Sequence, residues 1–352
     1  MKETNDLHIA GITPLISPRR LKEEFHMTES SNTTVVESRE VIKEILKGQD
    51  KRLLGIVGPC SIHDVHAVLD YAQRFKILRE KVLDRVYLIM RVYFEKPRTT
   101  VGWRGLVVDP YLNGTYDIAA GLRIARKLML DITGMGIPVG SEVLDPIVPQ
   151  YIADLLSWAS IGARTTESQT HRELASGLSM PVGIKNSTDG SLQTAIDAME
   201  SARYPHSFIG IDQEGSTCVL STRGNPAVHI ILRGGKYGPN YYEENVEEAE
   251  TVFKKLGIKP AIVVDCSHAN SGKKQNRQER VLHAIMDQRR RGKDSIVGFM
   301  IESFLVEGNQ SIPEDLTMLK YGCSVTDECV GWEKTNELVD YANDTMRNGG
   351  KT

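Results

Sequence analysis

The segment at residues 90–100, MRVYFEKPRTT, joins the pattern of a buried strand to a dense group of cations. Arg91, Lys96 and Arg98 fall within eight residues, and Thr99 follows them. The run VYLIMRVYF around Arg91 is otherwise apolar, which is typical of a strand that is buried on both faces. Arginine suits phosphate and carboxylate groups because its planar fork binds two oxygens at once. A core strand that delivers these cations to one spot therefore predicts a site for anionic molecules.

Seven further strand-like runs end in the same way, in a residue that can be charged or can bind a metal. The eight residues are Cys60, Arg91, Glu142, Arg164, Lys185, Arg233, His268 and Glu302. Solvated strand ends would explain one or two of them, but they explain eight of eight poorly. We therefore expect a functional site where the strand ends meet.

The eight runs alternate with amphipathic helical stretches along most of the chain. The runs occupy residues 53–60, 86–93, 138–144, 158–165, 181–186, 229–235, 261–268 and 296–303. Alternating strands and helices imply a parallel sheet, and eight units over about 250 residues match a (β/α)8 (TIM) barrel. An open doubly wound sheet is the alternative. In a barrel the carboxyl ends of all eight strands form one rim, and active sites lie on that rim.

Two strand-like runs are additional to the eight that the barrel requires. Residues 207–212 and 217–222 are joined by the Gly-containing link QEGS. Such a short link predicts a β-hairpin. We expect this hairpin, at 207–222, to be inserted between the fifth and sixth barrel strands.

The N-terminal part of the chain also precedes the barrel pattern. Residues 1–33 are polar and are expected to be partly ordered at best. Thr34 and Glu37 have the spacing of a capping box, which predicts a helix that starts there and ends at Gly48. The expected domains are an N-terminal extension and helix at 1–50, serving regulation and oligomerisation, and a catalytic barrel at 51–352.

The cations of the rim come from strands two, four, five and six and from the loop after strand two. They are Arg91, Lys96, Arg98, Arg164, Lys185 and Arg233. Six cations in one cleft would repel each other unless anions lie between them. The substrates should therefore carry several negative charges, such as two phosphates and a carboxylate.

The remaining rim residues suit a metal ion. Strand eight of a barrel pairs with strand one, so His268, Glu302 and Cys60 should be neighbours, and Asp327 can complete the set. This mixture of soft and hard donors suits one Mn²⁺, Fe²⁺, Co²⁺ or Zn²⁺ ion rather than Ca²⁺. Taken alone, Cys60 is better explained as a buried thiol, and His268 could be a hydrogen-bonded rim histidine; only their convergence favours the metal site. Cys266 should lie one layer deeper and is expected to be core packing.

The composition limits the class of protein. The chain has 352 residues, a formal net charge of −3 and a pI near 6.3, so nothing predicts the basic face of a nucleic-acid-binding protein. The N-terminus has no apolar segment typical of a secretory signal, and no run of about 18 apolar residues predicts a membrane span. Five cysteines, an odd and sparse set, favour a reducing, cytoplasmic location over a disulfide framework.

With these residues identified, the chain resembles the class I 3-deoxy-D-arabino-heptulosonate-7-phosphate (DAHP) synthases from about residue 36 to residue 345. The matching motifs are GPCSIHD, MRVYFEKPRTTVGW, IGARTTESQTHRE, PVGIKNSTDG, HIILRGGK, VDCSHANS, ESFLVEGNQ and YGCSVTDECVGW. The related synthase that makes the eight-carbon 3-deoxy-octulosonate phosphate shares the barrel and several motifs. It lacks the extended KPRTTVGW form and the N-terminal extension.

The resemblance implies that phosphoenolpyruvate condenses with erythrose 4-phosphate and releases inorganic phosphate. It implies that phosphoenolpyruvate is held by Arg91, Lys96, Arg164, Lys185 and Arg233. Arg98 and Thr99 would hold the phosphate of erythrose 4-phosphate, and Cys60, His268, Glu302 and Asp327 match the family's metal ligands. Lys96, Glu142 and His268 are the catalytic candidates: Glu142 would orient a water molecule, and Lys96 could protonate the new alkoxide.

The resemblance also implies inhibition by an aromatic amino acid at a subunit interface. The matching positions are Pro146, Gln150, Ser179, Phe208, Gly210 and Leu220. The stretches EVLDP and FIGID resemble the tyrosine-inhibited form, and Gly210 leaves room for a phenol hydroxyl where the phenylalanine-inhibited form typically has a serine. A phenylalanine-inhibited form remains an alternative, as does a tryptophan-inhibited form.

Two further expectations concern the whole molecule. Members of the family are expected to act as a homodimer or homotetramer. A catalytically silent amino-acid sensor on the same fold is the alternative to an enzyme, but a sensor could lose rim residues freely, and this chain retains all of them.

Overall fold

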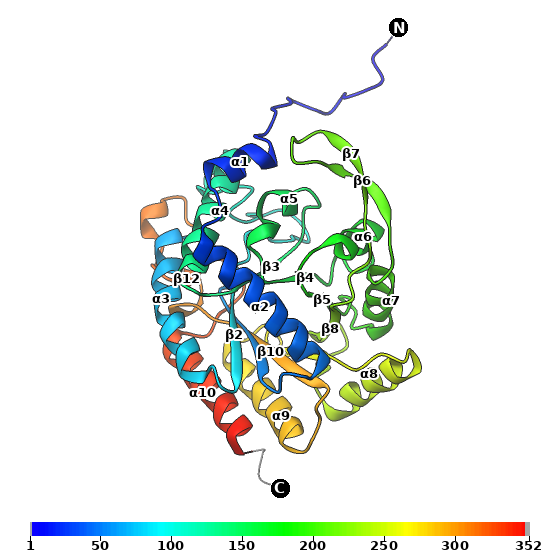
Figure 1. Ribbon diagram of the computed structural model, residues 1–352. Helices are drawn as coiled ribbons and strands as arrows, with labels where there is room; N and C mark the ends of the chain where they lie inside the picture. Colours follow the sequence, from blue (N-terminus) through cyan, green and yellow to red (C-terminus); the bar gives the residue numbers. More distant parts are fainter. Residues whose placement is uncertain (1, 349–352) are drawn as a thin grey trace.

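Eight parallel strands close into a barrel in the computed structural model, which describes residues 2–348. The barrel strands are β1 (Leu53–Gly58), β2 (Val86–Arg91), β3 (Val139–Glu142), β4 (Trp158–Ile161), β5 (Val182–Lys185), β8 (Val228–Leu232), β9 (Ile262–Asp265) and β10 (Ile296–Glu302). β10 pairs with β1 and completes the ring. Figure 1 shows the strands surrounded by helices. The predicted (β/α)8 barrel is confirmed, and the open sheet is excluded.

Helices follow the strands and pack around the barrel. They are α3 (Val65–Val82), α4 (Ile118–Gly134), α5 (Pro149–Ile152), α6 (Gln169–Gly177), α7 (Leu192–Ala202), α8 (Glu243–Lys255), α9 (Gln278–Arg290) and α10 (Trp332–Asn348). The barrel strands are buried almost throughout because the helices cover one face and the barrel interior covers the other. Among the helices of residues 2–348, none combines the length and the apolar composition that crossing a lipid bilayer requires.

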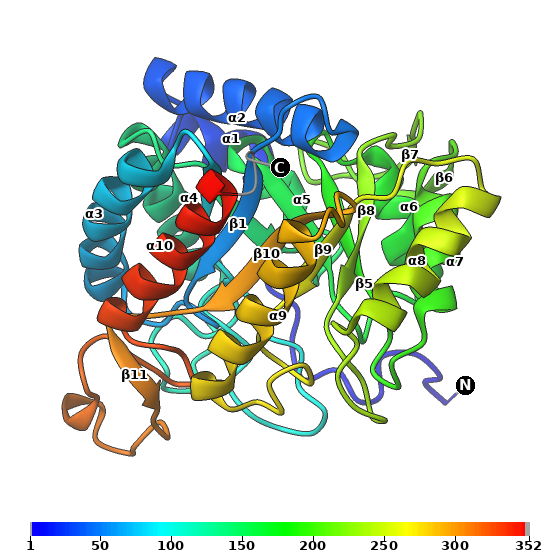
Figure 2. The same ribbon diagram turned by 90° about the horizontal axis from the view of Figure 1, so that it is seen from below.

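Helix α2 (Glu29–Lys47) lies at the amino-terminal end of the barrel strands, as Figure 2 shows. Ile42 and Ile45 are buried in one cluster with side chains of the barrel interior, among them Trp158 and Met300. Gly48 ends the helix in the left-handed conformation, with φ of 68°, as its position in the sequence predicts. Because α2 covers this end, the opposite end of the barrel is left for the site.

The predicted hairpin is also present. Strands β6 (Ser207–Ile211) and β7 (Thr217–Ser221) pair in antiparallel fashion and form a separate two-stranded sheet. In the sequence they lie between the barrel strands β5 and β8, which pair directly with each other. The short helix α1 (Pro18–Glu24) reaches the turn of this hairpin. There the backbone N–H of Arg19 donates to the Gln213 carbonyl at 2.8 Å, and Lys22 Nζ donates to the Gln213 side chain at 3.0 Å.

The start of α2 differs from the sequence expectation. The helix begins at Glu29, and Thr28 rather than Thr34 caps it by accepting a hydrogen bond from the backbone N–H of Ser31 at 3.2 Å. Ser31 is buried, and Thr34 Oγ1 donates to the Thr133 carbonyl of α4 at 3.0 Å. The polar residues of this stretch are therefore helical because α4 supplies partners for them. Part of the segment 1–33 is thus regular helix.

A small two-stranded sheet follows the last barrel strand. It pairs β11 (Val306–Asn309) with β12 (Cys323–Ser324), and the segment after β12 carries Asp327. The backbone N–H of Val330 donates to the Glu302 carbonyl at 3.0 Å. This bond holds the Asp327 segment against the end of β10.

Candidate active site

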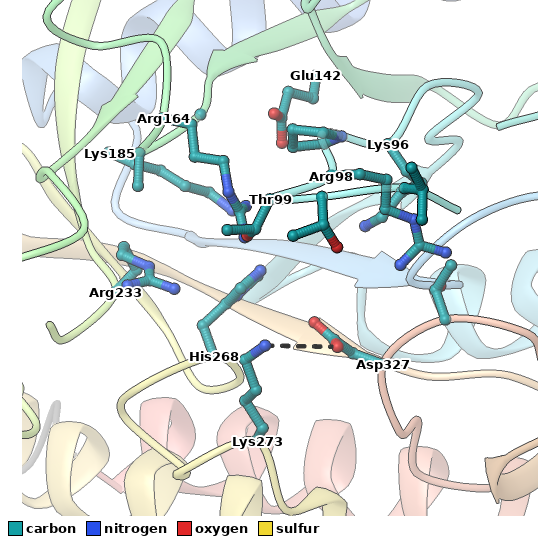
Figure 3. Close-up of a pocket in the computed structure, with 16 residues that line it drawn as sticks. Lys96, Arg98, Thr99, Glu142, Arg164, Lys185, Arg233, His268, Lys273 and Asp327 are labelled. Carbon is teal, nitrogen blue, oxygen red and sulfur yellow. Dashed lines mark hydrogen bonds and ion pairs between the residues drawn. The ribbon is translucent and has the colours of Figure 1, made fainter. Parts of the chain in front are cut away.

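The carboxyl ends of the barrel strands surround a cleft of about 280 Å³. Most residues predicted for the site line it, and Figure 3 shows their polar ends directed into one space. The lining side chains that carry charge or a hydroxyl include Lys96, Arg98, Thr99, Glu142, Arg164, Lys185, Arg233, His268, Lys273 and Asp327. Five of the eight predicted strand-end residues thus line one cleft, and Cys60, Arg91 and Glu302 are not part of its lining.

Arg91 lies beneath the floor of the cleft and is fully buried. Its Nη2 donates to Glu302 Oε1 at 3.1 Å, and its Nε donates to the Pro59 carbonyl at 3.2 Å. The guanidinium carbon lies 3.7 Å from the centre of the Tyr93 ring, which is the geometry of a cation–π contact. Nη1 has no hydrogen-bond partner within residues 2–348. A buried N–H group of this kind is costly unless a ligand accepts from it.

Three of the four predicted metal ligands converge at the end of β1. One ligand atom each from Cys60, Glu302 and Asp327 lies within 4.8 Å of the other two. The neighbourhood follows from barrel closure, because Gly58 of β1 stands in register with Glu302 of β10. Lys96 Nζ lies 3.1 Å from Cys60 Sγ.

His268 lies at the edge of this cluster. Its Nε2 is 3.9 Å from Glu302 Oε1, while its Nδ1 faces Asp265 at 2.8 Å. The backbone of His268 is left-handed, with φ of 54°, and its carbonyl accepts a hydrogen bond from the N–H of Lys273 at 2.7 Å. Non-glycine residues in this conformation are uncommon and cluster at functional sites.

The cluster fits a divalent metal ion. Burial and the nearby Glu302 carboxylate raise the pKa of the Cys60 thiol above its ordinary value. Two carboxylates held this close to a buried thiol repel each other and disfavour the thiolate, and a cation between them would offset both effects. Sulfur, imidazole and carboxylate donors together suit borderline ions such as Mn²⁺, Fe²⁺, Co²⁺ and Zn²⁺.

The cations of the cleft wall stand close to one another. Burial lowers the pKa of Arg233 below its ordinary value, and the charge of Arg164 nearby lowers it further. The Nε of Arg233 is buried and has no hydrogen-bond partner in the described part of the chain. Arg164 is exposed and reaches Thr99 Oγ1 at 3.3 Å, and Arg98 Nε donates to the Trp103 carbonyl at 2.8 Å. This wall can receive anionic groups.

Glu142 closes the cleft on the side of β3. Its Oε1 is buried without a hydrogen-bond partner among residues 2–348. The carboxylate can occupy this position because residue 162 is glycine, and any side chain there would collide with Glu142. An acceptor held in this way can bind a water molecule or a protonated group.

Two residues of the site do not figure among the residues predicted from the sequence. Lys273 lines the cleft with its Nζ 3.8 Å from Asp327 Oδ1, and its backbone is left-handed, with φ of 61°. Asp265 is fully buried below the cleft and pairs with Lys185 at 3.2 Å. The sequence holds a signal for Asp265, because a carboxylate inside the apolar run AIVVDCSH must have a buried partner.

The residues predicted for the regulatory pocket lie elsewhere. Gln150, Ser179, Phe208 and Leu220 line a separate cavity of about 460 Å³ between the hairpin, α5 and the end of α6. Gly210 is not part of the lining. It lies behind Leu220, and a Cβ at residue 210 would meet Leu220 Cδ1 at 2.5 Å. Pro146 is exposed and does not line this cavity.

Fold and site together define a (β/α)8 barrel with the rim of an enzyme, in which a cationic cleft adjoins a cluster of metal-ligand type. The chain belongs to the DAHP synthetase I family, whose sequence model matches residues 26–340. It is 52% identical over 335 residues to the Tyr-sensitive phospho-2-dehydro-3-deoxyheptonate aldolase of Escherichia coli, with 95% of this chain and 94% of that protein covered.

Two further relatives are similar over nearly their whole length. The Phe-sensitive phospho-2-dehydro-3-deoxyheptonate aldolase of Escherichia coli is 51% identical over 337 residues, covering 96% of each chain. The solved structure of the phospho-2-dehydro-3-deoxyheptonate aldolase of Francisella tularensis superposes with a TM-score of 0.94 at 46% identity, covering 96% of this chain and 98% of that chain. The relatives thus include both Tyr-sensitive and Phe-sensitive proteins.

Proposed function

We propose that this chain is a DAHP synthase that condenses phosphoenolpyruvate with erythrose 4-phosphate and releases inorganic phosphate, the first step of the shikimate pathway. The observation that carries the proposal is one cleft that adjoins the Cys60–Glu302–Asp327 cluster and is lined by cations from several strands. Two phosphates and a carboxylate are the anionic load that such a cleft suits. The family membership and the names of the relatives support the same reaction.

We propose that different cations of the cleft bind the two substrates. Phosphoenolpyruvate would be held by Arg91, Lys96, Arg164, Lys185 and Arg233. Arg98 and Thr99, on the loop after β2, would hold the phosphate of erythrose 4-phosphate. The two reactive carbons then meet above the floor of the cleft, so that the reaction becomes effectively unimolecular.

The chain's own residues serve the bond changes as follows. The methylene carbon of phosphoenolpyruvate attacks the aldehyde carbon, and positive character develops at C2 of phosphoenolpyruvate. Glu142 would orient a water molecule that adds to C2, after which the C–O bond to phosphate breaks. Lys96 would donate a proton to the new alkoxide oxygen. Desolvation alone would lower the pKa of Lys96, but Cys60 and Glu302 outweigh it and raise the pKa, so the ammonium form persists.

Cys60, His268, Glu302 and Asp327 would hold one divalent ion per subunit. When bound, the ion would polarise or orient the aldehyde oxygen as a Lewis acid. His268 is therefore a ligand in this proposal, and the proton transfer is left to Lys96.

The proposal is tested by supplying purified protein with phosphoenolpyruvate and measuring phosphate release and the seven-carbon product. We expect turnover with erythrose 4-phosphate after Mn²⁺ is restored to chelated protein. Turnover with arabinose 5-phosphate instead would favour the related eight-carbon synthase. Tight binding of an aromatic amino acid without turnover of either aldehyde would favour the silent sensor.

We further propose that tyrosine inhibits the enzyme by binding in the cavity beside the hairpin, in a homodimer or homotetramer. The cavity is separate from the cleft and is lined by Phe208 and Leu220, which suit an aromatic ring, and by Gln150 and Ser179, which offer hydrogen bonds. Gln150 Oε1 accepts from Gln213 Nε2 at 3.0 Å and so connects the cavity with the hairpin turn.

Gly210→Ser is expected to weaken inhibition by tyrosine and to favour phenylalanine. A side chain at residue 210 must displace Leu220, which narrows the cavity where a phenol hydroxyl would lie. Losing one buried hydrogen bond is equivalent to about 1–3 kcal/mol, or roughly a 5- to 150-fold rise in the inhibition constant. Titration of both amino acids against wild type and variant measures this change.

Ile209→Ala is the matched control, because Ile209 belongs to the same strand but is 79% exposed on its outer face. It should leave the preference between the two amino acids unchanged. A wild type that responds to phenylalanine and ignores tyrosine would show that the chain is the phenylalanine-inhibited form.

A further inference from the structure

The buried carboxylate of Asp265, the last residue of β9, makes contacts with two different parts of the active site. Its Oδ2 lies 2.8 Å from Nδ1 of His268 and 3.2 Å from Nζ of Lys185. Its Oδ1 accepts hydrogen bonds from Ser267, at 2.9 Å from the backbone N–H and at 2.6 Å from the hydroxyl. Asp265 itself is fully buried and does not line the cleft. It can therefore act only through the residues it contacts.

The charged neighbours of Asp265 favour its ionised form. Burial alone would raise its pKa, but His268 and Lys185 outweigh burial and hold the pKa well below its ordinary value. A buried carboxylate needs partners of opposite charge or hydrogen-bond donors. Oδ1 has two hydrogen-bond donors, whereas Oδ2 lies within ion-pair distance of His268 and Lys185 but makes no hydrogen bond of good geometry among residues 2–348. The same contacts restrict the positions of the His268 ring and the Lys185 ammonium group.

For His268, the contact selects one tautomer. Nδ1 also lies 2.8 Å from Ser267 Oγ, whose hydroxyl proton is donated to Asp265 Oδ1. Both neighbours of Nδ1 can therefore only accept, so the proton of a neutral imidazole lies on Nδ1. The lone pair then lies on Nε2, the nitrogen that is 3.9 Å from Glu302 and faces the cluster. The left-handed backbone of His268, with φ of 54°, brings the ring back toward Asp265, three residues earlier.

For Lys185, the contact supplies a counter-ion. Asp265 is the only carboxylate within ion-pair distance of this buried ammonium group in the described part of the chain. Burial alone would lower the pKa of Lys185, but Asp265 reverses that effect and the pKa is raised. Asp265 thus pairs with the charge that Lys185 presents to the cleft.

We propose that Asp265 is a positioning residue that serves both halves of the site, orienting His268 toward a metal ion and Lys185 toward the anionic substrate. The second half rests on the proposed function, whereas the first half needs only a metal in the cluster. One buried carboxylate thereby links the geometry of metal binding with that of phosphoenolpyruvate binding.

The test uses Asp265→Asn, which keeps the size of the side chain but replaces one acceptor oxygen with an N–H₂ donor. Mn²⁺ is titrated into chelated protein without substrate, and its dissociation constant should rise about 10- to 100-fold. At saturating Mn²⁺, the KM for phosphoenolpyruvate should still be about tenfold higher than in wild type, because Lys185 loses the charged partner that holds it.

Cys266→Ala is the matched control, because Cys266 is the next residue and is equally buried, and its Sγ lies 4.0 Å from the Val264 carbonyl oxygen. It should lower the melting temperature without changing either constant. Unchanged Mn²⁺ affinity in folded Asp265→Asn protein, or an equal loss in Cys266→Ala, would overturn the role toward His268. An unchanged or lower KM would overturn the role toward Lys185. If wild type binds Mn²⁺ but does not turn over phosphoenolpyruvate, the proposed function fails, and the Mn²⁺ comparison still tests the first role.

Discussion

Cys60→Ala is expected to abolish catalysis while the barrel stays folded. Cys60 is one of the three residues of the candidate metal cluster, in which one ligand atom each of Cys60, Glu302 and Asp327 lies within 4.8 Å of the other two. Alteration of a residue that merely supports a ligand typically costs 10–100-fold, so loss of the ligand itself should cost at least about 100-fold. The measurement is the rate of phosphate release by purified variant after chelation and addition of Mn²⁺, together with the Mn²⁺ dissociation constant.

Cys323→Ala is the appropriate control, since Cys323 is also buried but belongs to β12 and is not part of the cluster. It should retain both activity and Mn²⁺ affinity. Circular dichroism and thermal melting of Cys60→Ala would show whether the fold survives. Near-normal activity of this variant would mean that Cys60 is a packing residue, which is the simpler interpretation of a buried thiol.

The barrel could be predicted because its signals are local and repeated. Each buried parallel strand is a short apolar run, and each run ends in a polar residue at the same end of the barrel. Closure of the ring then brings Cys60 next to Glu302, although more than half of the chain separates them. The same argument predicted the cationic cleft without any knowledge of side-chain conformations.

Other features depend on contacts that no local pattern encodes. The early start of α2 is stabilised by Thr34 and Ser31 donating to carbonyls of α4 at 3.0 Å and 3.4 Å. Lys273 enters the cleft because its backbone is left-handed, with φ of 61°, a conformation that is rare for lysine. For Asp265 the apolar run indicates a buried carboxylate, but it does not identify the partners, which come from the loop after β9 and from β5.

The degree to which each cationic side chain is buried could not be predicted from the sequence. Arg91 and Lys185 are fully buried, whereas Arg98 and Arg164 are exposed and Arg233 lies between these extremes. The position of a residue along its strand determines the end of the barrel at which it lies. The conformation of the neighbouring loops determines how much water its side chain contacts. Depth matters for function because an ion pair is worth more when water is excluded from it.

Arg233→Ala is accordingly expected to impair the use of phosphoenolpyruvate strongly. Its Nε is buried and has no hydrogen-bond partner within residues 2–348, so an anionic group of the substrate is the natural acceptor. Losing one partner of a desolvated charge pair costs about 2–5 kcal/mol, which corresponds to a fall in kcat/KM of roughly 30-fold or more. Steady-state kinetics at saturating erythrose 4-phosphate would measure this fall in kcat/KM for phosphoenolpyruvate.

Variants at neighbouring positions separate charge from geometry. Arg233→Lys keeps the charge but loses the planar fork, so its kcat/KM should fall between those of wild type and Arg233→Ala. Arg164→Ala should also lower kcat/KM for phosphoenolpyruvate, near the lower end of the same range because Arg164 is more exposed. Arg98→Ala should instead act mainly on the KM for erythrose 4-phosphate.

Arg290→Ala serves as the control, because this arginine belongs to the last turn of α9 and its side chain is 63% exposed. It should leave both Michaelis constants unchanged. If Arg233→Ala behaves like Arg290→Ala, the buried N–H of Arg233 does not face the substrate. The anionic groups of phosphoenolpyruvate would then have to be bound by the other residues of the proposed set, which are Arg91, Lys96, Arg164 and Lys185.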